Sequence, residues 1–479
     1  MSKMTLPEKE EPVWTGLWRR TPREVNRMEL KGKKALVFGA GISGIGAAKL
    51  LLGIPAHVVL YDGNKELKET EIRARLPKSE YLSIVLGDIS DELIASLDLV
   101  ILSPGVPTDL PMVNRLRDAG LRIWGEVELA WACGKGDVLA ITGTNGKTTT
   151  TSLLGEIMKA WKDEVYVVGN IGTPYTGAAM VMSDKAVTVA EISSFQLETT
   201  ETFAPRVTSI LNITPDHLNR HHTMEEYIRV KELITANQQK DDTCVLNYED
   251  EVLREFGTTL HTKVLYFSSQ HKLEQGLYLD GGDICCSMDG EETVICHTKE
   301  LNIPGRHNYE NVMAAAGMAL AYGVPVEVIR TVCKNFQAVE HRIEYVTEKH
   351  GVVYYNDSKG TNPDAAIKGI QAMDRPTLLI GGGYDKDSSY EEWIQSFDGK
   401  VKYLVLIGQT KEKIAEAARA CGFEDIVFAE TLEEAVQFCA EHAVSGDAVL
   451  LLPACASWGM FPNYEVRGRR FKELVHQLS

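Results

Sequence analysis

The chain has 479 residues, of which 44% are hydrophobic and 24% are charged, as in an ordinary globular protein of about three domains. Its 67 acidic residues outnumber the 50 Lys and Arg residues, and the net charge of −17 argues against binding to nucleic acid or to an anionic membrane. The nine cysteines include no Cys-x-x-Cys pair, and no apolar run has the length of a membrane span or of a signal peptide. We therefore expect a cytoplasmic protein without a disulfide framework, a zinc site or a segment inserted in the membrane.

Residues 1–29 form a leader to which the sequence assigns no role. They mix prolines, charges and aromatic residues with little periodicity. Arg19, Arg20, Arg23 and Arg27 could form a basic arm, but charged runs are more often simply solvated. A solvated or surface-packed leader is therefore the favoured interpretation.

A nucleotide-binding pattern occupies residues 34–62. The apolar run 35–38 leads into the turn Gly-Ala-Gly-Ile-Ser-Gly at 39–44 and a helix of small residues, and a second apolar run ends at Asp62. This order of strand, glycine turn, helix, strand and acid is typical of a Rossmann-like unit, in which the acid meets a ribose hydroxyl. The pattern predicts a Rossmann-like domain over residues 30–125. It leaves the ligand open, because a helix N-terminus binds any phosphate.

A second turn of this domain, Ser103-Pro104-Gly105, follows the apolar run 99–102. It is expected at the carboxyl edge of the same sheet, where open α/β sheets bind ligands. The turn is therefore either part of a binding site or a plain β-turn.

The glycine-rich stretch Gly-Thr-Asn-Gly-Lys-Thr-Thr at 143–149 is the motif around which the chain is organised. It follows the apolar run 138–141 and opens a helix-like segment, an arrangement that points backbone N–H groups at a phosphate chain. Lys147 would add a charge at the β- and γ-phosphates, and Thr148 a hydroxyl for Mg²⁺. Ile141 stands where the standard phosphate loop has its first glycine. The alternative interpretation is a turn with a solvated lysine.

Two polar side chains follow predicted strands in the central third of the chain. Glu191 ends the apolar run 186–190, and His217 lies just beyond the run 209–213. Mg²⁺ ligands collect at strand ends beside a phosphate loop, and a carboxylate is a suitable oxygen donor. Histidine is an unusual Mg²⁺ ligand, so His217 is as readily a structural residue. Lys231 lies on an amphipathic helix, and this pattern alone predicts an exposed side chain.

The last part of the chain brings further polar groups. Asn308 and Asn311 are three residues apart on an Ala-rich helix, so they share a face that could contact an adenine or cap the helix. After a boundary at 336–342, strand runs alternate with helices again. These runs end in polar or glycine-rich turns, which gather at the carboxyl edge of a doubly wound sheet. The turns lie at 356–362, 381–386, 408–410 and 453–457.

Taken together, these stretches resemble the Mur ligases, the ATP-dependent amide-bond-forming enzymes of peptidoglycan precursor synthesis. Within that family the chain is most similar to the member that adds D-glutamate, mainly through Gly-Asn-Ile-Gly at 169–172 and Ser-Ser-Phe-Gln-Leu-Glu at 193–198. The resemblance covers the chain from about residue 32 to its end. The other motifs on which the resemblance rests lie at 143–149, 191–192, 216–218, 305–311, 341–342, 356–362 and 454–457.

The resemblance implies an α/β protein of three domains. These are a Rossmann-like UDP-substrate domain at 30–125, a central P-loop-type ATPase domain with a parallel sheet at 126–337, and a Rossmann-like amino-acid-binding domain at 338–479. It further implies a monomeric enzyme that adds D-glutamate to UDP-N-acetylmuramoyl-L-alanine through an acyl phosphate, with ADP and phosphate as products. Such an enzyme serves cell-wall biogenesis, and with it cell shape, cell division and the cell cycle.

The resemblance also implies a role for individual positions. The ATP site would contain Gly143, Thr144, Asn145, Gly146, Lys147, Thr148, Thr149, Asn308, Asn311, His341, Arg342 and Asp357. The UDP substrate would contact Ile42, Ser43, Asp62, Ser103, Pro104, Gly105, Asn170 and His217. The amino acid would be held by Lys359, Thr361, Lys386, Ser457 and Tyr464. One Mg²⁺ would be bound by Thr148 and Glu191 and the other by His217 and a CO₂-derived carbamate on Lys231, and the catalytic residues would be Lys147, Glu191, His217 and Lys231.

Several positions depart from the family pattern. Asp387 stands where a glycine is common, Asn219 replaces a frequent aspartate, and Trp458 and Tyr464 are bulky residues in the wall of the amino-acid site. These departures bear on which amino acid is added. The main alternative is thus a sister ligase that adds L-alanine or a dibasic amino acid. An NAD-dependent dehydrogenase built on residues 39–62 and a non-catalytic P-loop switch protein are more remote alternatives.

Overall fold

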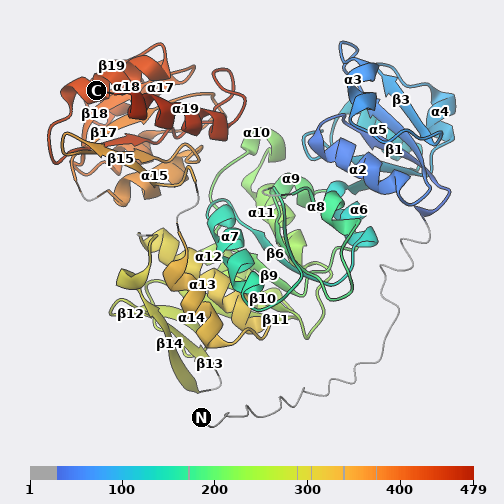
Figure 1. Cartoon of the computed structure of the whole chain (residues 1–479), viewed down its shortest axis with the longest axis horizontal. Helices are drawn as coiled ribbons and strands as arrows, with labels where there is room; N and C mark the ends of the chain where they lie inside the picture. The colour runs from blue at the N-terminus through green and yellow to red at the C-terminus, as the bar shows by residue number, and fades with distance from the viewer. Residues whose placement is uncertain are drawn as a thin grey trace, which may run out of the picture.

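The computed structural model describes residues 30–170, 173–288, 290–303, 305–337, 340–373 and 375–478. The predicted leader, 1–29, and the last two residues of the Gly-Asn-Ile-Gly motif lie outside this part of the chain. Three β-sheets with flanking helices follow one another along the sequence, which confirms the predicted α/β fold (Figure 1). We call the three units the N-terminal lobe (30–125), the central lobe (126–337) and the C-terminal lobe (340–478).

The N-terminal lobe contains a five-stranded parallel sheet of order β3-β2-β1-β4-β5. Strands β1 and β4 in the middle of the sheet are buried apolar runs, as expected when helices cover both faces of a parallel sheet. The strand order reverses between β1 and β4, so the turns after these two strands meet at the switch point where such sheets bind ligands. The elements are β1 Lys34–Phe38, α2 Ile42–Leu52, β2 His57–Asp62, α3 Glu69–Ala74, β3 Leu82–Leu86, α4 Asp91–Ala95, β4 Leu99–Leu102, α5 Pro111–Asp118 and β5 Arg122–Gly125.

The central lobe contains a nine-stranded sheet of order β14-β13-β12-β11-β10-β9-β6-β8-β7, in which β13 pairs antiparallel with both β12 and β14. Helix α7, which follows the phosphate loop, packs against α13. The first elements are α6 Glu126–Cys133, β6 Asp137–Thr142, α7 Lys147–Lys159, β7 Val165–Gly169, α8 Tyr175–Ala179, β8 Val187–Glu191, α9 Ser194–Leu197, β9 Val207–Ile210, α10 Leu218–His221 and α11 Met224–Glu232. The remainder are η1 Leu233–Thr235, β10 Thr243–Asn247, α12 Glu251–Thr259, β11 Lys263–Ser268, β12 Gly276–Asp280, β13 Asp283–Met288, β14 Glu291–His297, η2 Thr298–Glu300, α13 Arg306–Ala321 and α14 Val326–Asn335.

The C-terminal lobe contains a six-stranded sheet of order β15-β16-β20-β17-β18-β19, parallel except for the edge strand β15. Its elements are β15 Glu344–Lys349, β16 Val352–Asn356, α15 Pro363–Gln371, β17 Thr377–Gly381, α16 Glu391–Gln395, β18 Val401–Leu406, α17 Lys411–Ala420, β19 Ile426–Phe428, α18 Leu432–His442, β20 Ala448–Leu451 and α19 Tyr464–Gln477. None of the helices in the described ranges is long and apolar enough to cross a lipid bilayer.

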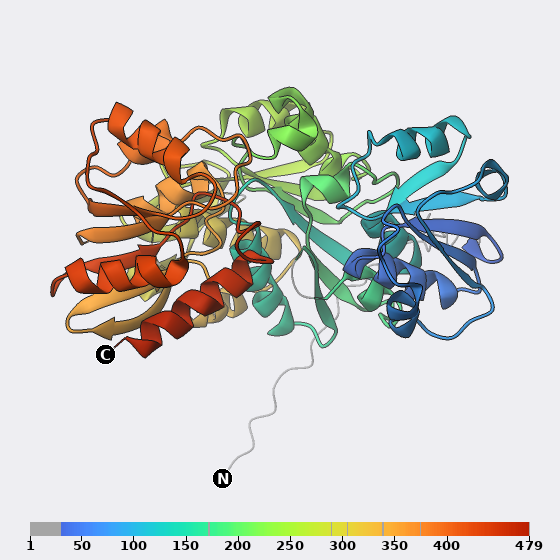
Figure 2. The ribbon, with the colours of Figure 1, turned by 90° about the horizontal axis from the view of Figure 1, so that it is seen from above.

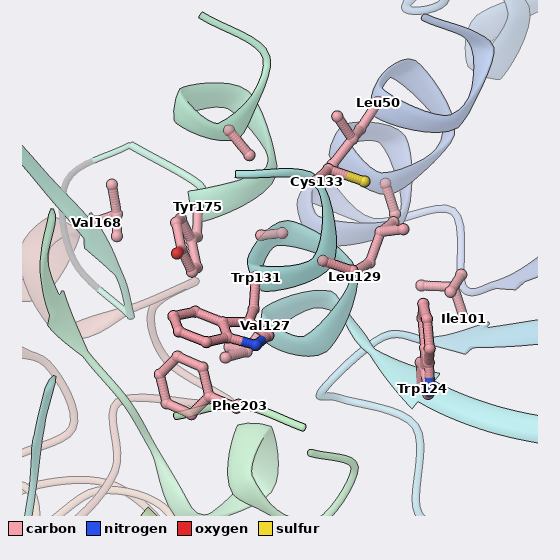
Figure 3. Packing of buried hydrophobic residues seen from close by; sticks show 14 of the residues in the cluster. Leu50, Ile101, Trp124, Val127, Leu129, Trp131, Cys133, Val168, Tyr175 and Phe203 are labelled. Carbon is pink, nitrogen blue, oxygen red and sulfur yellow. The ribbon is translucent and has the colours of Figure 1, made fainter. Parts of the chain in front are cut away.

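The hydrophobic clusters join two of the three lobes. One cluster runs from Leu50 of α2 through Trp124 and Leu129 to Tyr175 of α8 and Phe203, so the N-terminal and central lobes share a core (Figure 3). The two clusters of the C-terminal lobe consist only of its own residues among those described. Figures 1 and 2 show the two outer lobes on opposite sides of the central lobe. The C-terminal lobe therefore docks without a shared apolar core.

Candidate active site

A cavity of about 1180 Å³ extends from the glycine turn of the N-terminal lobe, past the phosphate loop, to the C-terminal lobe. It brings together many of the positions that the sequence singles out, although these positions are spread over all three lobes. The predicted residues that line it are Ile42, Ser43, Asp62, Ser103, Pro104, Gly105, Thr144, Lys147, Thr148, Asn170, His217, Lys231, His341 and Tyr464.

The N-terminal end of the cavity has the form of a phosphate and ribose site. The backbone passes so closely here that a Cβ atom on Gly44 would lie 1.7 Å from the Gly39 carbonyl oxygen, so only glycine fits. Asp62 Oδ2 accepts a hydrogen bond of 2.9 Å from the Ala40 amide, which places its carboxylate beside the turn. Ser103 Oγ is buried and has no hydrogen-bond partner among the described residues. A free hydroxyl facing the N-terminus of α2 suits an anionic ligand.

The phosphate loop begins where β6 ends and leads into α7. Gly146 has a φ of 84° at the N-cap of α7, a left-handed conformation that favours glycine. Lys147 Nζ donates to the carbonyl oxygens of Gly143 and Thr144 at 2.8 and 2.7 Å. The lysine thus lies folded along its own loop, with its amino group against the loop backbone. Thr149 is buried within α7 and lines neither this cavity nor the smaller one described below.

Glu191 and Thr148 form one pair of oxygen donors. Thr148 Oγ1 donates to Glu191 Oε2 at 2.8 Å, and Asn170 Nδ2 donates to Glu191 Oε1 at 3.0 Å. Glu191 is the last residue of β8 and is only 1% exposed. A buried carboxylate beside a hydroxyl at the start of α7 has the hard-oxygen chemistry that suits Mg²⁺.

His217 and Lys231 form a second group beside the phosphate loop. His217 has a φ of 55° and lines the cavity, and burial lowers its pKa to about 4, so the imidazole is neutral and able to act as a ligand. Lys231 is 1% exposed and its Nζ donates to the Gly143 carbonyl oxygen at 2.8 Å. Burial, followed by the charge of Lys147, holds the pKa of Lys231 well below its ordinary value.

The amphipathic pattern predicts that Lys231 is exposed, and this prediction is wrong. Tyr227, Val230 and Lys231 lie on one face of α11, and this face packs against the phosphate loop. Lys231 Nζ also lies 4.6 Å from the centre of the Tyr227 ring. A contact between α11 and a loop more than 80 residues away decides the burial, and the local pattern does not contain that information.

A second, small cavity of about 20 Å³ lies between the central and C-terminal lobes. Asn311 and Asn308 lie on one face of α13, and Asn311 Nδ2 donates to Asn308 Oδ1 at 3.3 Å, which confirms that they share a face. Neither carboxylate oxygen of Asp357 has a hydrogen-bond partner within the described ranges, and burial raises the pKa of Asp357 to about 6. Buried oxygens without donors are suited to the hydroxyl groups of a ribose. The predicted residues that line this cavity are Asn145, Gly146, Asn311, Arg342 and Asp357.

Of the five predicted amino-acid-binding residues, only Tyr464 lines the large cavity. Lys359 instead contacts Thr148 Oγ1 and lies 3.3 Å from the Tyr464 hydroxyl. Lys386 forms an ion pair with Asp216. Ser457 is 4% exposed, and Thr361 lies at the C-terminal end of the loop that carries Lys359. In this conformation the C-terminal lobe closes the region where an amino acid would bind.

Three contacts around the site involve residues to which the sequence assigned no role, namely Asp216, Asp364 and Glu126. Asp216 lines the cavity and accepts from Lys386 at 2.8 Å and from Asn362 at 3.0 Å, and the Lys386 charge holds the pKa of Asp216 well below its usual range. Asn145 contacts Asp364 across the same lobe boundary. Glu126 lines the cavity near Ser43 and accepts from Thr176 Oγ1 at 3.4 Å. Of these residues, only Asp216 could have been found from the sequence, because it belongs to the Asp-His-Leu motif at 216–218.

Comparisons with known proteins extend over nearly the whole chain. Residues 33–125 match the MurD-like N-terminal domain of Mur ligases, residues 141–319 the Mur ligase middle domain, and residues 341–455 the Mur ligase glutamate ligase domain. The chain is 58% identical to a UDP-N-acetylmuramoylalanine–D-glutamate ligase of Lachnoclostridium phytofermentans over 452 residues, which cover 94% of this chain and 100% of the relative. It is 45% identical to the enzyme of the same name from Clostridioides difficile, with 94% and 100% covered.

Solved structures share the fold. The structure of a UDP-N-acetylmuramate-alanine ligase from Thermotoga maritima superposes with a TM-score of 0.59 at 19% identity, covering 93% of this chain and 99% of that one. A MurF structure from Acinetobacter baumannii gives a TM-score of 0.60 at 16% identity, covering 94% and 98%. At these identities the likeness concerns the three-domain architecture alone.

Proposed function

Since this chain belongs to the Mur ligase family, we propose that it is an ATP-dependent ligase that joins D-glutamate to UDP-N-acetylmuramoyl-L-alanine in peptidoglycan synthesis. Relatives at 45 to 58% identity over their full length bear the name of that activity. The observation that carries the proposal is the single cavity that reaches all three lobes and contains the glycine turn, the phosphate loop and His217. One cavity of this kind can hold two substrates on separate lobes with their reacting groups facing each other.

Each lobe is assigned one substrate in this proposal. The N-terminal lobe holds the UDP group at the glycine turn, with Ser103 and Asp62 at its phosphates and ribose. The central lobe holds ATP on the phosphate loop, and its adenosine is assigned to the lobe boundary beside Asp357 and Asn311. The cavity of about 20 Å³ there has room for about one water molecule, so the C-terminal lobe has to move away before the adenosine can enter. The C-terminal lobe holds the amino acid through Lys386, Lys359 and the positions implied with them.

The first chemical step is the attack of the substrate carboxylate on the γ-phosphorus of ATP. It forms a C–O–P bond, breaks the bond between the γ-phosphorus and the β,γ-bridging oxygen and releases ADP. Lys147 supplies a positive charge to phosphoryl oxygens as negative charge gathers there. Thr148 and Glu191 would hold one Mg²⁺ and His217 and a modified Lys231 a second, and ions bound there would neutralise part of the phosphate charge.

Lys231 suits the carbamate that the resemblance implies. Because burial favours the neutral amine, its nitrogen has a free electron pair for CO₂, and the reaction converts the amine and CO₂ into a carbamate and a proton. The modified side chain would present anionic oxygens in the cavity that it already lines, near His217. A neutral amine would thereby become an anionic oxygen ligand suited to Mg²⁺.

The second step is amide formation. The free amine of D-glutamate attacks the acyl-phosphate carbon, and a tetrahedral intermediate forms. The nitrogen loses one proton, and collapse of the intermediate breaks the bond between that carbon and the oxygen attached to phosphorus, which releases phosphate. Closure of the C-terminal lobe excludes water, which would otherwise hydrolyse the acyl phosphate. We place this monomeric enzyme in the cytoplasm, where its product serves cell-wall biogenesis and thus cell shape, cell division and the cell cycle.

A scan of amino acids tests the proposal. Phosphate release from Mg²⁺-ATP is measured with UDP-N-acetylmuramoyl-L-alanine and each amino acid of both configurations. We expect strong stimulation by D-glutamate and little by L-glutamate, L-alanine or the dibasic amino acids. Stimulation by L-alanine with UDP-N-acetylmuramate, or by a dibasic amino acid with the longer sugar peptide, would assign the chain to a sister ligase.

A further inference from the structure

The C-terminal lobe presents an exposed aromatic pair beside the active site. The rings of Trp458 and Tyr384 meet edge to face, with centroids 5.5 Å apart and planes inclined by 65°. Trp458 lines the large cavity and is 50% exposed, and Tyr384 is 40% exposed. A large aromatic ring that remains half exposed in a cavity wall is a surface that a ligand can cover.

This pair belongs to the two loops that carry predicted amino-acid-binding residues. Trp458 directly follows Ser457, and Tyr384 lies two residues before Lys386. The Tyr384 amide donates to the Ala456 carbonyl oxygen at 2.9 Å, which joins the two loops through their backbones. The aromatic pair is thereby linked to both polar residues.

Three further contacts hold the joined loops together. A Cβ atom on Gly383 would lie 2.3 Å from the Ala456 carbonyl oxygen, so only glycine permits this approach. The buried Cys455 thiol lies 3.2 Å from the Thr410 hydroxyl and 3.2 Å from the Tyr390 hydroxyl. The backbone that carries Trp458 is therefore tied to the loop that carries Lys386.

We propose that Trp458 determines which amino acid this ligase accepts, by packing its indole face against the Cβ and Cγ methylene groups of D-glutamate. The inference rests on the proposed function. The face of an aromatic ring carries partial negative charge, so it favours C–H groups and disfavours carboxylates. The two carboxylates of the amino acid are accordingly held away from the ring, by the Lys386 ammonium group and at Ser457. D-Aspartate has one methylene group fewer and therefore covers less of the ring.

The structure is consistent with these proposed contacts of Lys386 and Trp458. Lys386 is paired with Asp216, which lines the same cavity as Trp458. An incoming carboxylate replaces the Asp216 carboxylate on Lys386, and the exposed indole face is covered as the amino acid enters. The polar contact thus fixes the charge of the accepted amino acid, and the ring fixes the length of its hydrocarbon chain.

Steady-state kinetics of Trp458→Ala and Trp458→Phe test the inference. For Trp458→Ala we expect the KM for D-glutamate to rise by about tenfold to fiftyfold, the effect of losing one or two methylene contacts, with kcat within about threefold of wild type. The KM values for ATP and for UDP-N-acetylmuramoyl-L-alanine stay unchanged, and the preference for D-glutamate over D-aspartate shrinks. Trp458→Phe restores most of the affinity because it keeps an aromatic face.

Phe428→Ala is the matched control, since Phe428 is a 40% exposed aromatic residue of the same lobe that does not line the cavity. An unchanged KM for D-glutamate in Trp458→Ala overturns the inference, as does a rise confined to the sugar nucleotide. The wild-type enzyme is assayed first, and a lack of stimulation by D-glutamate there refutes the proposed function itself.

Fluorescence provides a second measurement if Trp458→Ala does not fold. D-Glutamate added to wild type with the sugar nucleotide and a non-hydrolysable ATP analogue should change the tryptophan emission. The change should be absent in Trp458→Phe. An equal change in both proteins contradicts the inference.

Discussion

Lys386 of the C-terminal lobe and Asp216 of the central lobe form an ion pair with a distance of 2.8 Å between Nζ and Oδ1. Both side chains are nearly buried, at 5% and 9% exposure, and Asn362 donates to the other carboxylate oxygen. Because the hydrophobic clusters of the C-terminal lobe contain only its own described residues, polar contacts of this kind hold the lobe in place. The same lysine is proposed to bind the amino acid, so substrate binding and lobe docking use one group.

Asp216→Asn should open the ligand-free protein. A loss of only about 1.4 kcal/mol of docking free energy changes the ratio of closed to open molecules tenfold, and breaking a buried ion pair often costs about 3–5 kcal/mol. We expect a larger radius of gyration in small-angle X-ray scattering. The control is Asp447→Asn, because the Asp447–Lys402 pair at 2.6 Å lies within the C-terminal lobe. It should lower thermal stability and leave the radius of gyration unchanged, and equal radii for both variants would contradict the docking role.

Lys147→Ala should reduce phosphate release by at least about 100-fold, because a positioned charge at the developing phosphoryl charge is lost. Binding of the UDP substrate, measured by calorimetry, should stay near normal because that substrate is assigned to the other end of the cavity. Lys159→Ala removes an exposed lysine from the same helix and should leave both quantities unchanged. Equal losses of turnover and of UDP-substrate binding in Lys147→Ala would count against the assignment of lobes to substrates.

Lys231→Ala should be almost inactive, since the buried amine that forms the proposed carbamate is removed. Added formate or acetate should restore part of the activity by placing a carboxylate in the vacated space. A ¹³C NMR signal of a carbamate should appear in wild type supplied with ¹³CO₂ and be absent from the variant. Lys240→Ala changes an exposed lysine and serves as the control. Full activity of Lys231→Ala without added carboxylate would refute the carbamate.

Calorimetry should resolve two unfolding transitions, one for the N-terminal and central lobes together and one for the C-terminal lobe. Leu129 and Leu404 are both 0% exposed, in the shared core and in the C-terminal core respectively. Leu129→Ala should destabilise the first unit by about 2–5 kcal/mol and Leu404→Ala the second by a similar amount. If either substitution shifts both transitions equally, the three lobes unfold as one unit.

His307 should make stability depend on pH. Burial, followed by the charges of Arg342 and Lys368, lowers its pKa to about 3, against about 6.5 in an unfolded chain. Below pH 6.5 the unfolded chain therefore binds a proton that the folded protein does not bind. The free energy of unfolding decreases as the pH is lowered. The contribution is roughly 1 to 2 kcal/mol between pH 7.5 and 5.

Urea unfolding at the two pH values measures this difference. His307→Gln should lose that part of the pH dependence, and His57→Gln, at an exposed position of β2, reports the effect of replacing a histidine elsewhere. An unchanged pH dependence in His307→Gln would show that His307 does not cause it.

The sequence alone was sufficient for the α/β architecture, because buried strand runs, glycine turns and helix patterns are local properties. It also located the glycine turn at Gly39, the phosphate loop around Lys147 and the strand end at Glu191, since each lies directly after an apolar run. The fold brings these stretches to one cavity because parallel strands have their carboxyl ends at one edge of a sheet.

Tertiary structure alone decided the burial of Lys231 and the pairing of Lys386 with Asp216. Lys386 and Asp216 are 170 positions apart and lie on different lobes. No periodicity or spacing in the sequence encodes such a contact. Local patterns determine which faces of an element are apolar, and the packing of distant elements determines which charges meet. For this reason the residues of the phosphate loop could be predicted from sequence, but the contact that holds the C-terminal lobe over it could not.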